Sequence, residues 1–133
     1  MGSTGLGQET RVFIIDDYDK VRQQLVLRLR RESGIQVVGD APLSEGVLAK
    51  VRELRPDVVV LESKSRGGGG IETCRQLAKG EPPLNVLVLT SYVDEEERQQ
   101  AYMAGARAYL LKNVDATALL HYIAEAASGQ RIA

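Results

Sequence analysis

The sequence has few of the residues that build metal cages and disulfides. Its 133 residues include one cysteine, Cys74, and one histidine, His121. A single cysteine excludes an internal disulfide and a thiolate metal cage, and it is typical of a reducing compartment, so we expect the cytoplasm. A single histidine excludes His-rich zinc sites, and a Ser-His-Asp or Cys-His arrangement would have to use His121.

A strong charge of one sign and long apolar runs are also missing. The chain has 17 basic and 18 acidic residues and a net charge of -1. No overall field therefore attracts nucleic acid. No apolar run approaches the roughly 18 residues that a membrane span needs. We expect neither direct nucleic-acid binding by this segment nor a membrane span.

The length and the patterning indicate one folded domain. A chain of 133 residues can bury one core but is too short for two ordinary domains. The first ten residues, MGSTGLGQET, are Gly-rich without an apolar core, which predicts a loose tail over residues 1–10. The folded domain is expected over residues 11–129, and residues 130–133 are expected to start a linker or C-terminal tail.

Short apolar runs alternate with helical patterns five times along the chain. The apolar runs predict buried strands at residues 12–15, 35–38, 58–61, 86–89 and 108–111. Helical patterns follow at residues 19 to about 34, 43–54, 71 to about 80, 94–104 and 119 to about 129. The connections are too short for anything but crossovers. The sequence therefore predicts an α/β fold, a (βα)5 doubly wound domain with a five-stranded parallel sheet of the flavodoxin-like kind.

Some conspicuous side chains have simple structural interpretations. Asp19 is expected to be the N-cap of the first helix. Residues 94–97 place four carboxylates at the positive end of the fourth helix. Cys74 lies on the predicted inward face of the third helix, where it would fill the core. His121 points away from the apolar stripe of the last helix and is expected on the surface.

Polar side chains follow four of the predicted strands. Asp16 and Asp17 end the first, Glu62 the third, Thr90 the fourth and Lys112 the fifth. The carboxyl ends of parallel strands meet at one edge, where ligands of such sheets bind. Three carboxylates about 4 Å apart would repel by roughly 4 kcal/mol per pair at an effective dielectric near 20. A cation must therefore lie among them, either the internal Lys112 or an external Mg²⁺.

Taken together, these segments resemble the receiver domain of two-component response regulators. The resemblance covers about residues 11–129 and rests on VFIIDD, RPDVVVLE, Gly70-Ile71-Glu72, VLVLTS and GARAYLLK. GARAYLLK is most similar to the subgroup whose receivers precede a DNA-binding helix-turn-helix domain. The resemblance implies a regulatory module and not an enzyme. Its implied partners are a histidine kinase or other signalling protein, a second copy in a homodimer, and a DNA-binding output domain if the parent chain is longer.

The resemblance also implies roles for individual residues. In the family an acidic pair holds Mg²⁺, a strand-three aspartate accepts the phosphoryl group, a hydroxyl and a lysine contact the phosphate, and an aromatic residue reports the change. By position these are Asp16 and Asp17 for the pair, Thr90 for the hydroxyl, Tyr109 for the aromatic and Lys112 for the lysine. The implied metal ligands are Asp16, Asp17, Glu62 and the backbone carbonyl of Lys64, with weak or optional binding here.

Glu62 stands where the family has its phosphoryl-accepting aspartate, six residues after Pro56. Its extra methylene moves the carboxylate by roughly 1.5 Å. A misplacement of about 1 Å can cost on the order of a hundredfold in a reaction catalysed mainly by positioning. Ordinary phosphoryl transfer to Glu62 is therefore expected to fail or to be very slow. Because the carboxylates at this edge need a cation, we expect Glu62 to pair with Lys112. The domain would then be independent of phosphorylation, or a partial mimic of the phosphorylated state, and would act through protein-protein contacts.

Two alternatives remain open at this stage. The first is a phosphorylatable, Mg²⁺-dependent receiver that uses Glu62 or another residue. The second is a haloacid-dehalogenase-like phosphatase, because residues 17–21 match D-x-D-x-[TV] with Asp17 as the nucleophile. Such phosphatases need a further acidic strand-end motif after the lysine, and only two acidic residues follow Lys112.

Overall fold

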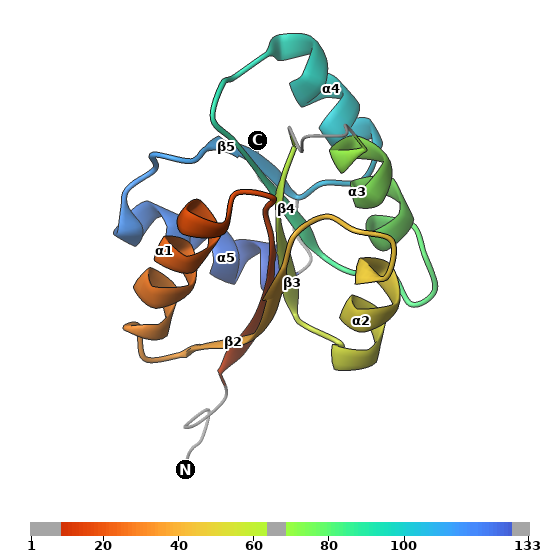
Figure 1. The fold of residues 1–133 in the computed structure, drawn as a ribbon. Coiled ribbons are helices and arrows are strands. Elements are labelled where there is room, and N and C mark those ends of the chain that lie inside the picture. Colours follow the sequence, from red (N-terminus) through yellow and green to blue (C-terminus); the bar gives the residue numbers. More distant parts are fainter. Residues whose placement is uncertain (1–8, 64–68, 129–133) are drawn as a thin grey trace.

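The computed structural model describes residues 9–63 and 69–128, in which five strands alternate with five helices (Figure 1). The strands are β1 (Thr10–Ile15), β2 (Ile35–Ala41), β3 (Val58–Glu62), β4 (Val86–Thr90) and β5 (Ala108–Leu111). The helices are α1 (Asp19–Arg30), α2 (Val47–Leu54), α3 (Gly70–Ala78), α4 (Glu95–Met103) and α5 (Ala116–Ala127). All five predicted strands and all five predicted helices are present.

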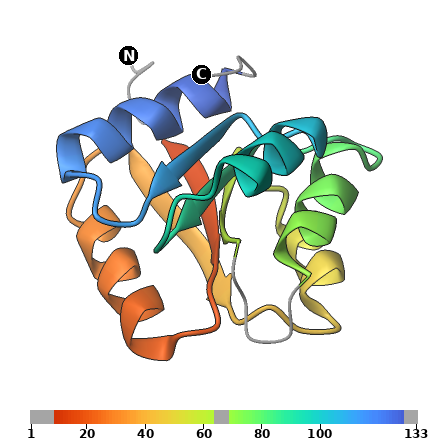
Figure 2. The ribbon, with the colours of Figure 1, turned by 90° about the horizontal axis from the view of Figure 1, so that it is seen from above.

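The five strands form one parallel sheet in the order β2-β1-β3-β4-β5. The chain starts near the middle, moves outward to β2 and then returns across β1 to the other side, which is the doubly wound arrangement. Helices α1 and α5 cover one face, and α2, α3 and α4 cover the other (Figure 2). The predicted fold class is confirmed.

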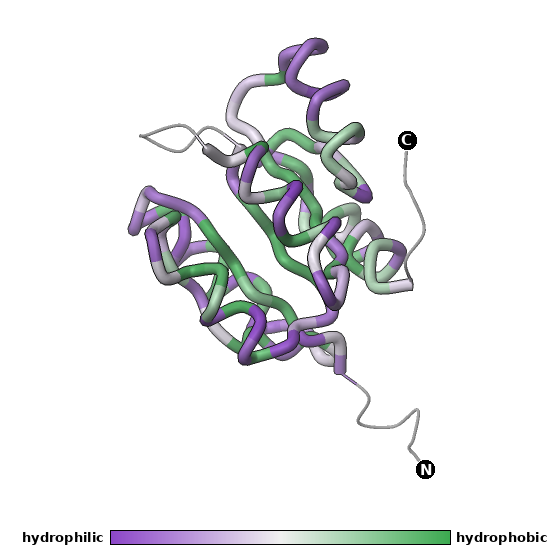
Figure 3. The backbone as a smooth tube through the Cα atoms, turned by 90° about the vertical axis from the view of Figure 1, so that its right-hand side faces the viewer, coloured by the Kyte–Doolittle hydropathy of each residue, from purple (hydrophilic) through white to green (hydrophobic). Residues whose placement is uncertain are grey.

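The inner strands β3 and β4 are apolar up to their last residues because helices cover both faces of the sheet. Every residue of β3 and of β4 is buried, as expected for the inner strands of a covered parallel sheet. Alternate side chains of β3 serve different layers: Val59 and Leu61 pack toward α2, α3 and α4, and Val58 and Val60 toward α1 and α5. Figure 3 shows hydrophobic strands inside and hydrophilic residues along the helices. Buried Cys74 belongs to the core, as predicted.

Two predicted boundaries are wrong in detail. Thr10 was placed in the tail, but it opens β1 and its N–H donates to the carbonyl of Gly34. The second helix was expected from Leu43, but α2 begins at Val47, and Leu43 lies in the preceding connection, where its N–H donates to the carboxylate of Asp17 at 2.7 Å. Residues 1–8 and 129–133 lie outside the described ranges, so the domain limits remain predictions.

The helix starts differ in how they are capped. Asp19 is the first residue of α1 and not its N-cap, which is Tyr18, and the Asp19 carboxylate instead pairs with Arg22 at 2.8 Å. Asp94 is the N-cap of α4 and accepts hydrogen bonds from the N–H groups of Glu96 and Glu97. The predicted acidic start of this helix is therefore confirmed. In the last helix, His121 is exposed, also as predicted.

None of the helices in the described ranges has the length and apolar character that crossing a membrane would require.

Candidate functional site

The site lies at the carboxyl edge of the sheet, because strands β1, β3, β4 and β5 are neighbours there. Asp16 follows β1 and Lys112 follows β5, while Glu62 and Thr90 are the last residues of β3 and β4. In the sheet register, Glu62 lies opposite Leu89 of β4. The topology therefore brings four of the residues singled out in the sequence to one edge.

Asp16, Glu62 and Lys112 meet in a group that we call the lysine cluster. The Lys112 Nζ donates to Asp16 Oδ2 at 2.8 Å and forms an ion pair with Glu62 Oε2. The Asp16 and Glu62 side chains are only 4% and 2% exposed. The pairing expected between Glu62 and Lys112 is thus present in the structure, and the same lysine also pairs with Asp16.

The charge of Lys112 is stabilised by this environment. Burial by itself lowers the pKa of the ammonium group, but the hydrogen bonds and charges of Asp16 and Glu62 outweigh it, and the pKa is raised above its ordinary value. The Lys112 Nζ also lies 5.6 Å from the centre of the Tyr18 ring, which adds a cation–π contact. Lys112 therefore stays protonated at any physiological pH.

Asp16 is held in place by its own loop as well as by the lysine. Its Oδ1 accepts from the N–H of Tyr18 at 2.9 Å. Its backbone carbonyl accepts from the Arg22 guanidinium at 2.7 Å, and this buried arginine also pairs with Asp40 on the end of β2. The carboxylate is therefore oriented toward Lys112 by a network that extends to the neighbouring strand.

Asp17 turns to a different partner. Its Oδ1 accepts from the N–H of Leu43, so it fixes the connection between β2 and α2. Residues 9–63 and 69–128 contain no group of three or more His, Cys, Asp or Glu side chains placed to hold a metal ion. The Lys112 ammonium group lies between Asp16 and Glu62, where a cation would otherwise lie, and Asp17 accepts from Leu43, so the arrangement present does not fit Mg²⁺. The magnesium ligand set remains a prediction, and Lys64 lies outside the described residues.

A second group, which we call the glutamate cluster, consists of Ser63, Glu97 and Tyr109. One oxygen of Glu97, Oε1, accepts from Ser63 Oγ at 2.9 Å and from Tyr109 Oη at 2.6 Å. Tyr109 Oη in turn accepts from the N–H of Asp94 at 3.2 Å. The cluster joins the residue after Glu62 to the start of α4 and to β5.

The Tyr109 side chain is directed into the protein. The residue is 6% exposed. Burial, together with the hydrogen bond to the Glu97 carboxylate, raises the pKa of its hydroxyl to about 12. Tyr109 is therefore a neutral donor to Glu97 at physiological pH, and its ring packs with the core residues beneath α3 and α4.

Thr90 is fully buried at the end of β4. Its Oγ1 donates to the carbonyl of Tyr92 at 2.9 Å and accepts from the N–H of Tyr92 at 3.2 Å. The hydroxyl thus shapes the loop that leads into α4. The phosphate-contact role implied for Thr90 remains a prediction.

Sequence reasoning missed Ser63 and Glu97. Glu97 is three residues after the N-cap Asp94, a spacing typical of a capping box, so the sequence suggests a local role at the helix start. The contact with Ser63 depends on how α4 is rotated against the sheet, and no short-range pattern encodes that rotation. The only signal available was the position of Ser63 directly after Glu62.

The carboxylate of Glu62 is held inside the protein. Its side chain is almost wholly buried and is paired with an ammonium group. The oxygens of Glu62 therefore stabilise the charge of Lys112.

Comparison with known proteins places this geometry among signalling domains. The family model described as the response regulator receiver domain matches residues 12–124. The DNA-binding transcriptional activator DevR/DosR of Mycobacterium tuberculosis is 36% identical over 122 residues, which cover 92% of this chain and 56% of that protein. The response regulator GacA of Pseudomonas aeruginosa is 35% identical over 121 residues, which cover 91% of this chain and 56% of GacA. The chain spans little more than half the length of these relatives.

Solved structures give the same result. A signal receiver domain from Mycobacterium tuberculosis has a TM-score of 0.85 at 26% identity, covering 92% of this chain and 99% of that one. The response regulator ChrA of a heme-sensing two-component system has a TM-score of 0.77 at 35% identity, covering 93% of this chain and 59% of ChrA.

Proposed function

Because the chain belongs to the response regulator receiver domain family, we propose that it is an atypical receiver whose signalling does not depend on phosphorylation of Glu62. The carrying observation is the buried ion pair between Glu62 and Lys112. In a receiver of the ordinary kind, the lysine would contact the incoming phosphate. Here the longer carboxylate of Glu62 reaches it directly.

Geometry and charge both support this proposal. The extra methylene of Glu62 displaces its oxygens by roughly 1.5 Å from where an aspartate would hold them. Releasing the Glu62 oxygen for attack would also separate a buried ion pair, which costs several kcal/mol. Phosphoryl transfer would therefore face both a misplaced nucleophile and a lost internal contact.

The same pair makes Glu62 a partial mimic of the phosphorylated state. A phosphoryl group carries close to two negative charges and three acceptor oxygens, whereas glutamate offers one charge and two oxygens. Glu62 supplies the contact to Lys112, and Tyr109 is already buried against Glu97. We infer that the two clusters hold the domain in one state, which acts through protein-protein contacts.

The partners of the domain follow from the family and from the length of its relatives. DevR/DosR is named as a DNA-binding transcriptional activator, and this chain matches 56% of it. The proposal therefore includes a longer regulator in which this domain controls a DNA-binding output domain, in the cytoplasm and as a homodimer. A histidine kinase or another signalling protein would be the upstream partner.

The direct test compares wild type with Glu62→Asp after incubation with acetyl phosphate and Mg²⁺, using intact-protein mass spectrometry. Glu62→Asp should acquire one phosphoryl group, and the wild type should react at least about a hundredfold more slowly. Glu62→Gln, which has no carboxylate, sets the background. Phosphorylation of the wild type as fast as that of Glu62→Asp would show that Glu62, or another residue, is an ordinary acceptor.

The family match does not favour the haloacid-dehalogenase-like alternative. The carboxylate of Asp17, its proposed nucleophile, accepts a hydrogen bond from the Leu43 N–H and shapes a neighbouring loop. We expect the wild type to hydrolyse a generic aryl phosphate no faster than Asp17→Asn. Hydrolysis by the wild type clearly faster than by Asp17→Asn would support the phosphatase interpretation.

A further inference from the structure

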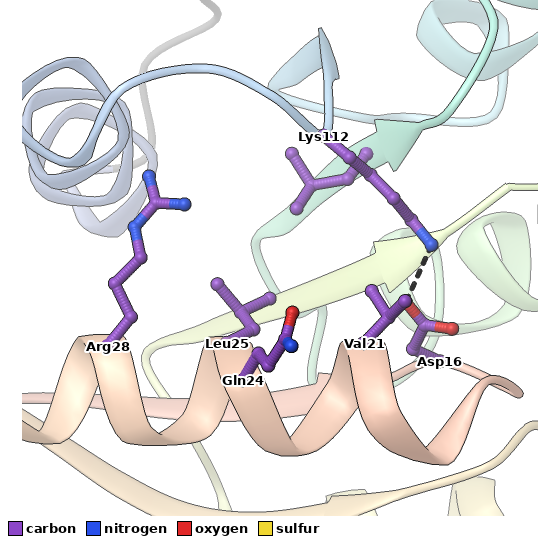
Figure 4. Close-up of a pocket in the computed structure, with 7 residues that line it drawn as sticks. Asp16, Val21, Gln24, Leu25, Arg28 and Lys112 are labelled. Carbon is purple, nitrogen blue, oxygen red and sulfur yellow. Dashed lines mark hydrogen bonds and ion pairs between the residues drawn. The ribbon is translucent and has the colours of Figure 1, made fainter.

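A pocket of about 190 Å³ lies beside the lysine cluster, between α1 and the residues that follow β5 (Figure 4). One end is formed by the Asp16–Lys112 pair and the other by the side chain of Arg28 (Figure 4). Between these ends the lining consists of the apolar Val21, Leu25 and Leu89 and the polar amide of Gln24. The pocket is therefore mainly apolar in the middle and charged at both ends.

The helix α1 forms its side of the pocket with a stripe of side chains beside its buried residues, and Leu25 of this stripe also packs against the core. Its buried residues are Arg22, Val26 and Leu29. Val21, Leu25 and Arg28 are spaced four and three residues apart, so they lie along an adjacent stripe of the same helix. Val21 is 39% exposed although it is apolar. An apolar stripe that remains accessible next to a polar site is the kind of surface a small ligand covers.

Arg28 provides an unneutralised positive charge at its end of the pocket. Its Nη2 donates to the carbonyl of Val114 at 2.7 Å, which fixes the guanidinium across the gap between α1 and the β5–α5 connection. A guanidinium has five N–H donors, so one hydrogen bond leaves others for a ligand. Within residues 9–63 and 69–128, Arg28 forms no ion pair with a carboxylate. By contrast, the positive charge at the opposite end, on Lys112, is already shared between Asp16 and Glu62.

From this arrangement we propose that the pocket binds a small carboxylate with an aromatic or branched apolar body. The carboxylate contacts Arg28, since a guanidinium fork matches its two oxygens. The apolar body lies against Val21, Leu25 and Leu89. The size is appropriate, because an apolar cavity of about 150 Å³ is known to hold one benzene ring. A single ring with a small charged substituent therefore fits, and a nucleotide does not.

This ligand would be the input that replaces phosphorylation, a step that rests on the proposed function. Lys112 lines the pocket and also holds Glu62 through its ammonium group. A ligand packed beside the Lys112 stem therefore contacts the same side chain that fixes the lysine cluster. Binding at Arg28 and the state of Glu62 would be linked through one residue.

Benzoate is a suitable probe, followed by the amide NMR spectrum of the isotope-labelled chain without any phosphoryl donor. We expect saturable shifts at Val21, Leu25, Arg28 and Leu89 at millimolar concentrations, as befits so small a ligand. Benzyl alcohol has the ring without the charge, and acetate has the charge without the ring. Each should bind at least about tenfold more weakly than benzoate.

Three variants test the assignment. Arg28→Gln should weaken benzoate binding at least about tenfold, and Val21→Phe, which fills the pocket from an exposed position, should abolish it. Arg30→Gln removes an exposed arginine of the same helix and should leave binding unchanged. Absence of shifts in the wild type, equal binding by Arg28→Gln, or equal binding of acetate overturns the proposal.

The two proposals can fail separately. If benzoate binds as expected but Glu62 accepts phosphate, the site stands and its role as a replacement input is lost. If benzoate does not bind and Glu62 resists phosphorylation, the atypical receiver stands without this ligand site. As a readout of the link, benzoate should also shift the Glu62 and Lys112 amides in the wild type but not in Arg28→Gln.

Discussion

The lysine cluster and the glutamate cluster begin at consecutive residues, Glu62 and Ser63, yet they are built in opposite ways. In the first, one cation lies between two carboxylates that are nearly fully buried. In the second, one carboxylate of a partly exposed residue, Glu97, lies between two neutral hydroxyl groups. The first cluster cannot lose its central residue without leaving like charges buried together. The second loses only hydrogen bonds.

The two clusters therefore have different roles at the carboxyl edge of the sheet. Buried charges are costly to leave unpaired, so the lysine cluster has one strongly preferred arrangement. Hydrogen bonds from hydroxyl groups to a partly exposed carboxylate contribute less, because water can replace them. The lysine cluster therefore defines the state of the β3 end, and the glutamate cluster connects this state to α4 and Tyr109 with contacts that can be exchanged.

The largest effect is expected from Lys112→Met, which leaves Asp16 and Glu62 buried without their cation. Removing one partner of a buried ion pair costs about 3–5 kcal/mol. Urea denaturation should show a loss of this order in the free energy of unfolding. Lys50→Met, at an exposed lysine of α2, should change it by no more than about 0.5 kcal/mol.

A companion variant sharpens this result. Adding Glu62→Gln to Lys112→Met removes one of the two stranded charges and should restore part of the lost free energy. If Lys112→Met were nearly neutral by itself, the two carboxylates would not depend on the lysine. The contrast between the clusters would then be wrong.

Glu97→Ala is expected to have the next largest effect. The variant removes the common acceptor of Ser63 and Tyr109 while the tyrosine hydroxyl stays buried, so we expect a loss of about 2 kcal/mol. Urea denaturation again provides the measurement. Glu96→Ala at the neighbouring exposed position is the matched control and should have little effect. A loss of unfolding free energy as large as that of Lys112→Met would show that both clusters stabilise the fold equally, and the contrast between them would be wrong.

Two features of the structure could be predicted from the sequence alone. The buried strands were predictable because a parallel sheet covered on both faces needs continuous apolar runs. The pairing of Glu62 with Lys112 was predictable because carboxylates brought to one edge need a cation. The first inference follows from the topology, and the second from the carboxylates that this sequence places at the strand ends.

The remaining details depend on orientation, which the sequence does not state. A carboxylate in the first turn of a helix satisfies the helix dipole whether it faces water or the core, so nothing marked Glu97 as a partner of Tyr109. Likewise, Leu43 fits the apolar spacing of the next helix, but it lies in the connection before α2, where its N–H donates to Asp17. Sequence patterns give the element but not the direction of its polar side chains.

Tyr109→Phe tests the glutamate cluster through pH. At neutral pH the loss of the hydroxyl should cost about 1 kcal/mol, the usual net value of one hydrogen bond. The native pKa of Tyr109 is raised to about 12 from an ordinary value of 10. Its contribution is therefore complete below pH 10 and is lost as the pH rises toward 12.

The measurement is the free energy of unfolding of wild type and Tyr109→Phe at pH 7 and at intervals above pH 10. The wild type should lose its advantage over the variant in this range. Lys112 also has a raised pKa, so both proteins should lose stability as the pH rises above its ordinary value of 10.5. Tyr92→Phe, at an exposed tyrosine, should show no such difference from the wild type. A constant gap between wild type and Tyr109→Phe would contradict the assignment.

The smallest effect is expected from Ser63→Ala. Glu97 keeps its bond to Tyr109 in this variant and can accept from water in place of Ser63, so the loss should be about 0.5 kcal/mol. Ser91→Ala, at an exposed serine, is the control.

Because Ser63 and Tyr109 donate to the same oxygen of Glu97, their effects should not add. Combining Ser63→Ala with Tyr109→Phe leaves Glu97 without either donor, and the double variant should differ from the sum of the single variants. Strict additivity would mean that the two hydroxyl groups act separately, and the proposed connection from the β3 end through Glu97 to β5 would have no energetic basis.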